Sequence, residues 1–414
     1  MKSGIPPLRG MEDIWGERAA LFHQIETVCR KWFSRFNYQE MRTPLLESSE
    51  VFHRTLGETS DAVQKETYTF TDRSGDSVTL RPEGTASVVR ALIANDLIQH
   101  LPQKFFYYGP MFRHERPQKG RLRQFHQIGV EALGYRDPWS DVETIALAYE
   151  ILIDLGISDV CRLEINSLGD SDSRRCHRAL FVDYLMQHRE QLSPESKLRL
   201  EKNPLRIFDS KDENDRRILK QAPLLKDHLN DVSKAFFDQV LKGLTLLGIP
   251  FEVNPYLVRG FDYYHHSVFE FTTDRLGSQS AILSGGRYDQ LVEEMGGPHT
   301  PAVGWALGVE RIELLILQKK SWSYPLPPSI AILPLDQITN DQALLIAQRL
   351  RKAGWRCELM SDGKIAKRIQ KAEKRGFSLV AFLGPDELRE DKLTVKDLGT
   401  GNQTVWSLNH IPLV

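Results

Sequence analysis

Apolar residues near the N-terminus recur at the spacing of one face of a helix. They are Leu21, Phe22, Ile25, Val28, Cys29, Trp32, Phe33 and Phe36. A period close to 3.6 residues predicts an amphipathic helix over 17–36. An extended stretch follows and ends at Thr43-Pro44, because the residue before a proline avoids the helical region.

Short β-rich runs predict two hairpins in the next part of the chain. The segments 66–72 and 77–81 flank a Ser-Gly-Asp turn, and the longer apolar-aromatic runs 104–114 and 124–134 flank the mobile basic loop ERPQKGRLR. The remaining periodicities predict two helices and a strand, over 84–99, 138–155 and 161–167.

The segment from about 170 to 250 differs from its surroundings because it is charged, largely helical in pattern and interrupted by prolines. We interpret it as an insertion. Strand patterns return after it, at 251–253, 267–273 and 280–286. The segment 304–317 then predicts a strand or turn that leads into a helix. Three prolines within 321–329 predict a linker.

Strands and helices alternate beyond this linker. The predicted strands are IAILPL, 355–360 and SLVAFLG, and the predicted helices are 340–353 and 364–375. KLTVKD, a GTGN turn and TVWSL follow. This alternation predicts a small α/β domain with a mostly parallel or mixed sheet.

The composition is that of an ordinary globular chain of two or three domains. The 414 residues include 41% hydrophobic and 26% charged residues, and Lys+Arg 54 nearly balances Asp+Glu 55. The balance gives no hint of nucleic acid, although a local basic patch stays possible. The 4 cysteines form no CxxC pair, and we find neither a secretion signal nor an apolar run of membrane-spanning length. We therefore expect no metal site and a soluble cytoplasmic protein.

The candidate chemistry lies in arginines that stand beside glycines, aromatic residues and carboxylates at the ends of predicted elements. In the fragment Arg81-Pro82-Glu83-Gly84-Thr85, the Glu83 carboxylate could accept hydrogen bonds from a substrate ammonium, and Gly84 would allow a close approach. The alternative is an N-capped helix start with a solvated carboxylate.

The second fragment runs from Phe112 to Glu131. Between positions 113 and 123 it carries five cations and one acid, which suits phosphate because guanidinium pairs bidentately with phosphate oxygens. Strand alternation places Phe125, Gln127 and Glu131 on one face, over one pocket. The alternative is a solvated edge hairpin whose arginines make weak surface pairs.

Three further fragments combine polar groups with glycine. They are LVRGFDYY at 257–264, GGRYD at 285–289 and GWALGVER at 304–311. Tyrosine, aspartate and arginine are costly in a core unless their polar ends are partnered. An arginine just inside a helix start can present its guanidinium to an anion.

In this order the five fragments resemble the histidyl-tRNA synthetases, a family of class II aminoacyl-tRNA synthetases. The resemblance extends from Arg9-Gly10-Met11 to Val395-Lys396-Asp397, with class II motifs 1, 2 and 3 at 17–44, Phe112–Glu131 and Gly304–Arg311. His265-His266 departs from the family outside the matching positions.

The resemblance implies an α+β fold. A class II antiparallel sheet of six to seven strands, flanked by helices, would form a catalytic domain over 1–320 that contains the helical insertion at about 170–250. A linker over 321–328 and an anticodon-binding α/β domain over 329–414 would follow.

The implied activity is a histidine–tRNA ligase. It activates L-histidine with ATP to histidyl-adenylate and pyrophosphate, and then transfers histidine to the 3′ end of tRNA(His). An ionised carboxylate needs no general base, so catalysis would rest on positioning and electrostatics. Mg²⁺ would be held mainly by the ATP phosphates, and the resemblance implies no protein metal ligand.

The resemblance also implies the roles of individual residues. Arg113 and Arg259 would be catalytic, on opposite sides of the α-phosphate. The expected ATP-binding residues are Arg113, Glu115, Arg121, Phe125, Arg259 and Arg311. The expected histidine-binding residues are Glu83, Thr85, Gln127, Glu131, Tyr263, Tyr264 and Tyr288. Arg116 and Gln118 would meet the acceptor end of the tRNA.

Further expectations concern the assembly. The basic helix at 364–375 would bind tRNA, and the alternative for about half of its charges is a solvated helical face. Trp32, Phe33 and Phe36 on the first helix predict a homodimer, because they give more apolar surface than one exposed face should carry.

One alternative is a non-catalytic regulatory relative, such as the regulatory subunit of ATP phosphoribosyltransferase, and another is a synthetase for a different amino acid. The presence of Arg113, Arg259 and Arg311, together with about 86 residues beyond the linker, favours the enzyme. LVRGFDYY and GGRYD favour histidine.

Overall fold

The structure is a computed structural model with two compact units, Met1–Trp322 and Ser323–Val414, and each is described by itself. The residues that it describes are 4–56, 66–258, 263–277, 281–320, 322, 327–337, 339–410 and 412–413. In this part of the chain we find no helix with the length and apolar character that a membrane crossing requires.

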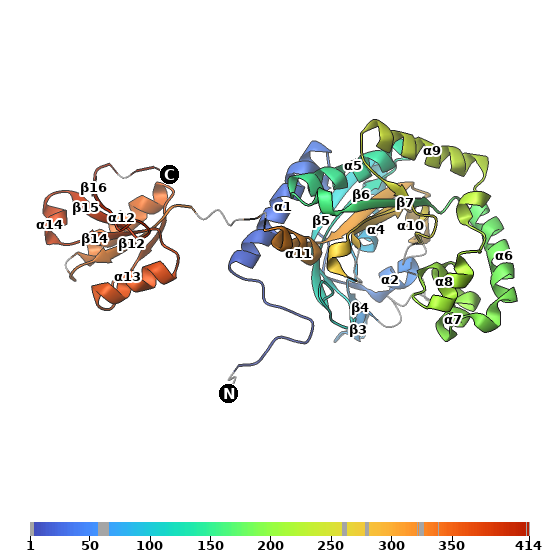
Figure 1. The fold of residues 1–414 in the computed structure, drawn as a ribbon, viewed down its shortest axis with the longest axis horizontal. Helices are drawn as coiled ribbons and strands as arrows, with labels where there is room; N and C mark the ends of the chain where they lie inside the picture. Colours follow the sequence, from blue (N-terminus) through green and yellow to red (C-terminus); the bar gives the residue numbers. More distant parts are fainter. Residues whose placement is uncertain are drawn as a thin grey trace. The chain divides into compact units, whose positions relative to one another are not determined.

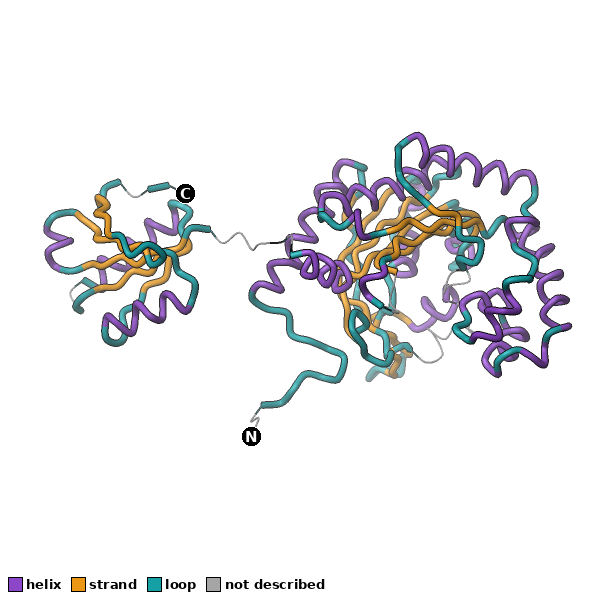
Figure 2. The backbone as a smooth tube through the Cα atoms, in the orientation of Figure 1, coloured by secondary structure: helices purple, strands orange, loops and turns teal. Residues whose placement is uncertain are grey.

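The first unit is built on an eight-stranded sheet in the order β1-β5-β6-β11-β10-β9-β7-β8 (Figures 1 and 2). The strands are β1 Gln39–Glu40, β5 Gln103–Phe112, β6 Gln124–Leu133, β7 Arg162–Ser167, β8 Glu252–Val253, β9 His265–Thr272, β10 Ala281–Arg287 and β11 Ala302–Gly308. The six inner strands are antiparallel, and only the two-residue edge strands β1 and β8 pair in parallel. The predicted antiparallel sheet flanked by helices is confirmed.

One face of this sheet carries the larger hydrophobic core. Its alternate strand residues, such as Phe106 on β5 and Val130 on β6, pack against four helices. These helices are α1 Glu17–Arg35, α5 Pro138–Asp154, α9 Asp231–Leu246 and α11 Val309–Lys319. Burial of such side chains on a sheet face is the main stabilising contribution to a layered fold.

The other face meets shorter elements and carries the polar residues of the motifs. The helices here are α2 Ser49–Leu56, α4 Thr85–Ala94 and α10 Leu291–Glu294, and a 3₁₀ turn η1 covers Leu97–His100. A small sheet of β2 Leu46–Ser48, β4 Ser77–Leu80 and β3 Tyr68–Thr71 stands beside them. Both predicted hairpins, β3–β4 and β5–β6, are present.

The first helix uses its apolar residues inside the unit. Phe33 is 1% exposed and stacks on Phe106, while Trp32 donates its indole N–H to Asp154. Trp32 and Phe36 are only partly buried, yet both pack against the same core. The expectation that α1 carries surplus apolar surface was therefore wrong, because the helix faces two neighbouring helices as well as the sheet.

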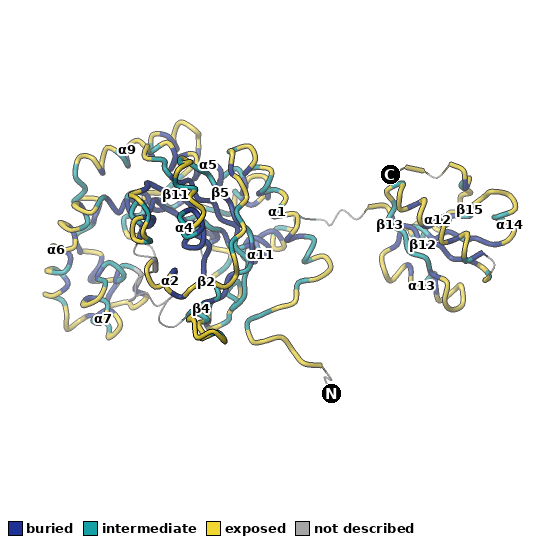
Figure 3. Tube along the Cα trace, turned by 180° about the vertical axis from the view of Figure 1, so that it is seen from behind, coloured by how far each residue is buried: buried dark blue, intermediate teal, exposed yellow. Residues whose placement is uncertain are grey.

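The insertion has a hydrophobic core of its own. It contains α6 Ser171–Gln187, α7 Pro194–Lys202, α8 Glu213–Leu219 and the 3₁₀ turns η3 Arg189–Gln191, η4 Pro204–Asp209 and η5 Leu225–His228. These helices form a separate group in Figure 1 and present much exposed surface in Figure 3. The last helix of the predicted insertion, α9, instead packs against α5 in the main core. The segment with its own core therefore ends before α9 and is shorter than the insertion of about 170–250 that the charge pattern predicted.

The second unit contains the predicted small α/β domain. Its sheet has the order β13-β12-β14-β15-β16, with β12 parallel to both neighbours and the other pairs antiparallel. The strands are β12 Ser329–Pro334, β13 Arg356–Leu359, β14 Leu379–Leu383, β15 Lys392–Asp397 and β16 Gln403–Ser407, and the helices are α12 Asn340–Lys352, α13 Ile365–Lys374 and α14 Pro385–Arg389. The inner strand β12 is buried along its whole length, as a parallel strand covered on both faces must be (Figure 3).

Candidate active site

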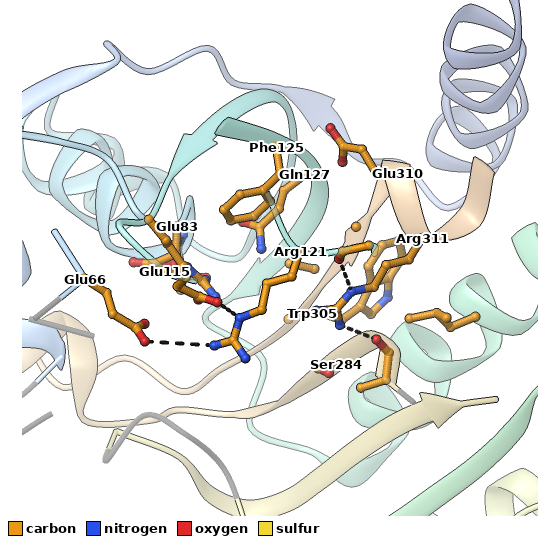
Figure 4. Close-up of a pocket in the computed structure, with 18 of the residues that line it drawn as sticks. Glu66, Glu83, Glu115, Arg121, Phe125, Gln127, Ser284, Trp305, Glu310 and Arg311 are labelled. Atoms are coloured by element: carbon orange, nitrogen blue, oxygen red, sulfur yellow. Dashed lines mark hydrogen bonds and ion pairs between the residues drawn. The ribbon is translucent and has the colours of Figure 1, made fainter. Parts of the chain in front are cut away.

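A cavity of about 400 Å³, which we call the substrate cavity, opens on the polar face of the large sheet. It gathers most of the predicted site residues, which come from α4, β5, β6, β10 and α11 and the segments between them. These are Glu83, Thr85, Arg113, Glu115, Arg121, Phe125, Gln127, Glu131, Tyr263, Tyr264, Tyr288 and Arg311. Figure 4 shows several of these side chains around one space. Arg259 lies outside the described residues.

Glu131 lies at the buried end of the substrate cavity. Its carboxylate accepts a hydrogen bond of 2.7 Å from the Thr85 hydroxyl and another from the Tyr288 hydroxyl. Burial raises the pKa of Glu131 to about 8, although both hydroxyls act to lower it. Among the residues that the structure describes, no cation lies within ion-pair distance of this carboxylate.

Glycines create the room around Glu131. A Cβ on Gly304 would lie 2.0 Å from Glu131 Oε2, so only glycine fits there. Cβ atoms on Gly129 and Gly84 would lie 2.2 and 2.3 Å from the Tyr107 ring. Our sequence analysis missed Tyr107, which lines the cavity, although its place opposite Gly129 in the predicted hairpin was a usable signal.

Glu83 combines the two interpretations that its sequence position allowed. Its carboxylate accepts the backbone N–H groups of Thr85 at 2.6 Å and Ala86 at 2.8 Å, at the first turn of α4. It is buried, however, rather than solvated, and this burial raises its pKa. A helix-start carboxylate thus also lines the substrate cavity.

Arg113 stands between the strand hairpin and the loop before α4. Its Nε donates to the Pro82 carbonyl at 2.9 Å, and its guanidinium lies 5.2 Å from the centre of the Phe125 ring. Burial lowers its pKa. In the described part of the chain, no carboxylate forms an ion pair with Arg113.

Two further arginines face the same cavity. Arg121 forms ion pairs with Glu115 and, at 3.9 Å, with Glu66 (Figure 4). Arg311 donates from Nε to the Gly120 carbonyl at 3.1 Å and from Nη1 to the Ala281 carbonyl. Burial, followed by the charges of Arg113 and Arg121, lowers the pKa of Arg311 to about 10. Three arginines thus lie close enough to influence one another, and Arg121 among them is paired with carboxylates.

Arg116 and Gln118 do not join this group. Both lie exposed on the loop of the β5–β6 hairpin, where Gln118 and Arg121 exchange backbone hydrogen bonds. The N-terminal segment supports this loop, because the Gly10 carbonyl accepts the N–H of Arg123 at 2.7 Å. Gly10 has φ +82°, and a Cβ there would lie 2.8 Å from Pro117.

Two motif arginines serve the fold instead. Arg81 donates to the carbonyls of Pro110 and Thr43, and so connects the end of class II motif 1 to strand β5. Arg287 is fully buried and paired with Asp141 on α5. Residues close to them in the sequence, Glu83 and Tyr288, line the cavity. The sequence pattern did not distinguish residues that stabilise the fold from residues that line the cavity.

Other lining residues escaped the sequence analysis. They include Glu66, Arg206, Ser284, Trp305 and Glu310. Arg206 comes from η4 of the insertion, so only the tertiary structure brings it here. Glu310 could have been found from the sequence, because it directly precedes Arg311 in the third class II motif. Its carboxylate accepts the backbone N–H of His126 at 2.9 Å.

The basic helix predicted at 364–375 is α13, and its charges divide into two groups. Lys364, Lys367, Lys371 and Lys374 are exposed along one side. Arg368 is buried and donates to the carbonyls of Pro334 and Met360, so it was wrongly counted with the basic surface. In the ranges that the structure describes, no group of three or more acidic, histidine or cysteine residues could hold a metal ion.

An antiparallel sheet with a cavity that gathers buried carboxylates and arginines from a hairpin and a helix start is the arrangement expected of the catalytic domain of a class II aminoacyl-tRNA synthetase. The family model for histidyl-tRNA synthetase matches residues 10–312, and that for an anticodon binding domain matches residues 329–412. The chain belongs to the histidyl-tRNA synthetase family.

Curated relatives support the same conclusion. A histidine–tRNA ligase of Rhodospirillum rubrum is 48% identical over 98% of this chain and 97% of its own length. A histidine–tRNA ligase of Gluconobacter oxydans is 48% identical over 97% of this chain and 96% of its own length.

Solved structures agree with these relatives. Apo histidyl-tRNA synthetase of S. aureus has a TM-score of 0.82 at 33% identity and covers 98% of both chains. A Bacillus halodurans chain described as an ATP phosphoribosyltransferase regulatory subunit/histidyl-tRNA synthetase has a TM-score of 0.65 at 20% identity, which shows the fold alone.

The activity is thus that of a histidine–tRNA ligase. The enzyme activates histidine with ATP to histidyl-adenylate and pyrophosphate, and then transfers histidine to its tRNA. The regulatory alternative is not favoured, because full-length relatives are ligases.

Proposed function

We propose that the substrate cavity binds histidine at its Glu131 end and ATP at its arginine end. The observation that carries this proposal is that one cavity holds two kinds of ionisable side chain. Glu131 is a buried carboxylate whose described partners are hydroxyls, Glu83 is a buried carboxylate at the start of α4, and Arg113, Arg121 and Arg311 line the same cavity. Carboxylates and hydroxyls suit a cationic amino group and an imidazole, and guanidiniums suit a triphosphate.

On the histidine side, Glu83 and Thr85 lie near the expected α-ammonium. Gln127, Glu131, Tyr264 and Tyr288 surround the imidazole, with Tyr263 closing the pocket. Gln127 supports this assignment because its Oε1 is buried without a hydrogen-bond partner among the described atoms. A pocket whose polar groups are left unpaired by an isostere discriminates by on the order of 10⁴–10⁵.

On the ATP side, Arg113 bridges the histidine carboxylate and the α-phosphate, and Arg259 lies across the α-phosphate. The carboxylate oxygen attacks phosphorus while pyrophosphate leaves. Both guanidiniums then meet the charge that develops in the transition state. Arg311 holds the γ-phosphate, Glu115 and Arg121 line the nucleotide, and Phe125 stacks on adenine.

Mg²⁺ is held mainly by the phosphates of ATP in this proposal. The two carboxylates nearest the arginines, Glu66 and Glu115, are engaged with Arg121, which fits a metal that enters with the nucleotide. When bound, Mg²⁺ neutralises phosphate charge and orients the pyrophosphate leaving group.

For tRNA, we propose that residues 1–320 catalyse, 321–328 link, and 329–414 bind the anticodon of tRNA(His). Arg116 and Gln118 are free to meet the acceptor end because their loop is exposed. The lysines of α13 suit the phosphate backbone. Lys367→Gln with Lys371→Gln should weaken tRNA charging and reduce its salt dependence while leaving pyrophosphate exchange unchanged.

We also propose a cytoplasmic homodimer. Its contact is the outer face of the β2–β4–β3 sheet, where Leu46 and Phe70 are 46% and 48% exposed and Val78 and Leu80 lie between them. A second copy would cover this apolar face. Light scattering that finds a stable 47.5 kDa species at micromolar concentration would contradict the dimer.

The experiment that tests the cavity assignment separates binding from chemistry. Arg259→Lys should slow single-turnover adenylate formation by on the order of 10²–10³ with little change in histidine affinity, whereas Arg113→Gln should slow it and also weaken histidine binding, because Arg113 contacts the histidine carboxylate. Glu131→Gln should weaken histidine binding. A folded Arg259→Lys variant with normal adenylate formation would remove Arg259 from the catalytic role.

A further inference from the structure

The entry and exit of the insertion are tied together at the first turn of α6. Asp170 caps α6 by accepting the N–H of Ser173 at 2.8 Å, and Asn230 caps α9 by accepting the N–H of Ser233 at 2.9 Å. The two capping side chains are themselves joined, because Asn230 Nδ2 donates to Asp170 Oδ2 at 2.7 Å. This fixes where α6 begins, and therefore where Arg174, one turn further along, is held.

Arg174 reaches from this turn to the segment that follows Arg259. Its Nη1 donates to the Tyr264 carbonyl at 3.0 Å, and its Nη2 donates to His265 Nε2 at 2.5 Å. One planar guanidinium thus holds two consecutive residues, which a lysine ammonium cannot do with the same geometry.

The hydrogen bonds of His265 define its protonation state. Its Nδ1 lies 2.8 Å from the Tyr263 carbonyl, which can only accept, and its Nε2 faces a guanidinium, which can only donate. The ring is therefore neutral, with its proton on Nδ1. Burial, followed by the charge of Arg174, lowers the pKa of His265 to about 4, in agreement with this geometry.

Together the two side chains hold the backbone of the tyrosine pair. The carbonyls of Tyr263 and Tyr264 are bound by His265 and Arg174, while the two rings, 4.6 Å apart, line the substrate cavity. The Tyr263 ring also lies 5.7 Å from Tyr288. Displacement of this backbone would move two walls of the histidine side.

Arg174 does not touch the substrates in this arrangement. Among the described residues it lines a neighbouring cavity of about 740 Å³ at the insertion, and Tyr264 is part of the wall of both cavities. We propose that Arg174 and His265 are positioning residues that hold Tyr263 and Tyr264 in place for histidine recognition. This inference rests on the proposed function, which places the two tyrosines around histidine.

The test measures the KM values for histidine and ATP by pyrophosphate exchange, with thermal unfolding beside them. Arg174→Gln should raise the histidine KM on the order of tenfold and leave the ATP KM within about twofold, because Arg113, Arg121 and Arg311 lie on other elements. Arg174→Lys, which keeps the charge but loses the fork, should fall between Arg174→Gln and the unmodified enzyme.

Variants of His265 supply the rescue. His265→Gln keeps an acceptor near the place of Nε2 and should retain most of the histidine affinity, whereas His265→Phe should raise the histidine KM as Arg174→Gln does. Combining Arg174→Gln with His265→Phe should raise the histidine KM by less than the product of the two single effects, because each substitution removes the contact between Arg174 and His265. The matched control is Arg175→Gln, the adjacent exposed arginine paired with Asp172, which should leave both KM values unchanged.

Tyr264→Ala separates this inference from the proposed function. If Tyr264→Ala leaves the histidine KM unchanged, the tyrosines do not form the histidine pocket and the proposed function fails. If Tyr264→Ala raises the histidine KM and folded Arg174→Gln does not, the positioning role alone is overturned. A loss of activity in proportion to unfolding, with both KM values unchanged in Arg174→Gln and Arg174→Lys, would also overturn it.

Discussion

Two buried carboxylates in the same unit, Asp141 and Glu131, have opposite surroundings. Asp141 on α5 is paired with the guanidinium of Arg287, which also donates to the Tyr135 carbonyl and to Asp289. Glu131 on β6 has two hydroxyl partners, and no described cation lies within ion-pair distance. The first charge is compensated inside the fold, and the second is left for a ligand.

The arginines show the same contrast. Burial lowers the pKa of Arg287, but the carboxylates of Asp141 and Asp289 outweigh it, and the net shift is upward. Burial lowers the pKa of Arg113, whose Nε donates to the Pro82 carbonyl and whose guanidinium lies over the Phe125 ring. An uncompensated buried charge weakens the free protein and is expected where binding or catalysis needs it.

The GGRYD motif joins these two environments. Arg287 and Tyr288 are neighbours in the chain, yet Arg287 reaches Asp141 and Tyr288 reaches Glu131. Successive residues near a strand end point to opposite sides, so one motif supplies both a structural ion pair and a cavity wall. A motif match therefore does not by itself identify a substrate-binding residue.

The largest effect should follow from breaking the compensated pair. Asp141→Ala leaves Arg287 buried without its main partner and should lower the free energy of unfolding by about 3–5 kcal/mol, measured by urea denaturation. Adding Arg287→Met should recover part of this loss. A loss below about 1 kcal/mol would mean that Asp141 does not compensate Arg287.

Glu131→Gln should have the reverse profile. Because the pKa of Glu131 is raised to about 8, the substitution replaces a protonated carboxyl at neutral pH by an amide of the same shape. Stability at neutral pH should therefore be retained, while kcat/KM for histidine falls on the order of 10²-fold. Pyrophosphate exchange at varied histidine, with Tm as the control, measures this. A fall in Tm with unchanged histidine KM would place Glu131 with Asp141 instead.

The pH dependence of stability sharpens the contrast further. The pKa of Glu131 is about 8 in the folded state, against a reference of 4.5, so between these values the folded state holds a proton that the unfolded state has lost. The stability from this proton is present below pH 4.5 and is lost as pH rises through 8. Relative to Glu131→Gln, the unmodified protein should lose about 3–4 kcal/mol between pH 5 and 8. If the free energies of unfolding of the unmodified protein and of Glu131→Gln differ by the same amount at every pH, the pKa of Glu131 is not raised.

The smallest effect should come from Tyr288→Phe. Removing one hydroxyl takes one donor from Glu131 and should raise the histidine KM by roughly five- to tenfold, with the ATP KM unchanged. Steady-state exchange kinetics test this. Equal changes in both KM values would show that Tyr288 shapes the whole cavity rather than the histidine side.

The sequence by itself determined the local elements and the shared face of β6. Phe125, Gln127 and Glu131 line the substrate cavity because strand alternation is a property of the backbone, independent of what packs against it. Helix periodicity likewise predicted α1 and α5, and the proline-rich segment separated the two units.

Only the tertiary structure decided what each charged or apolar residue meets. Arg287 and Arg368 are buried in the fold, Phe33 packs inside the unit, and Arg174 and Arg206 come from the insertion to the active-site region. Pairing between residues far apart in the chain depends on how helices and sheets are layered. The environment that makes a charge structural or functional is thus set by packing, which one-dimensional spacing does not encode.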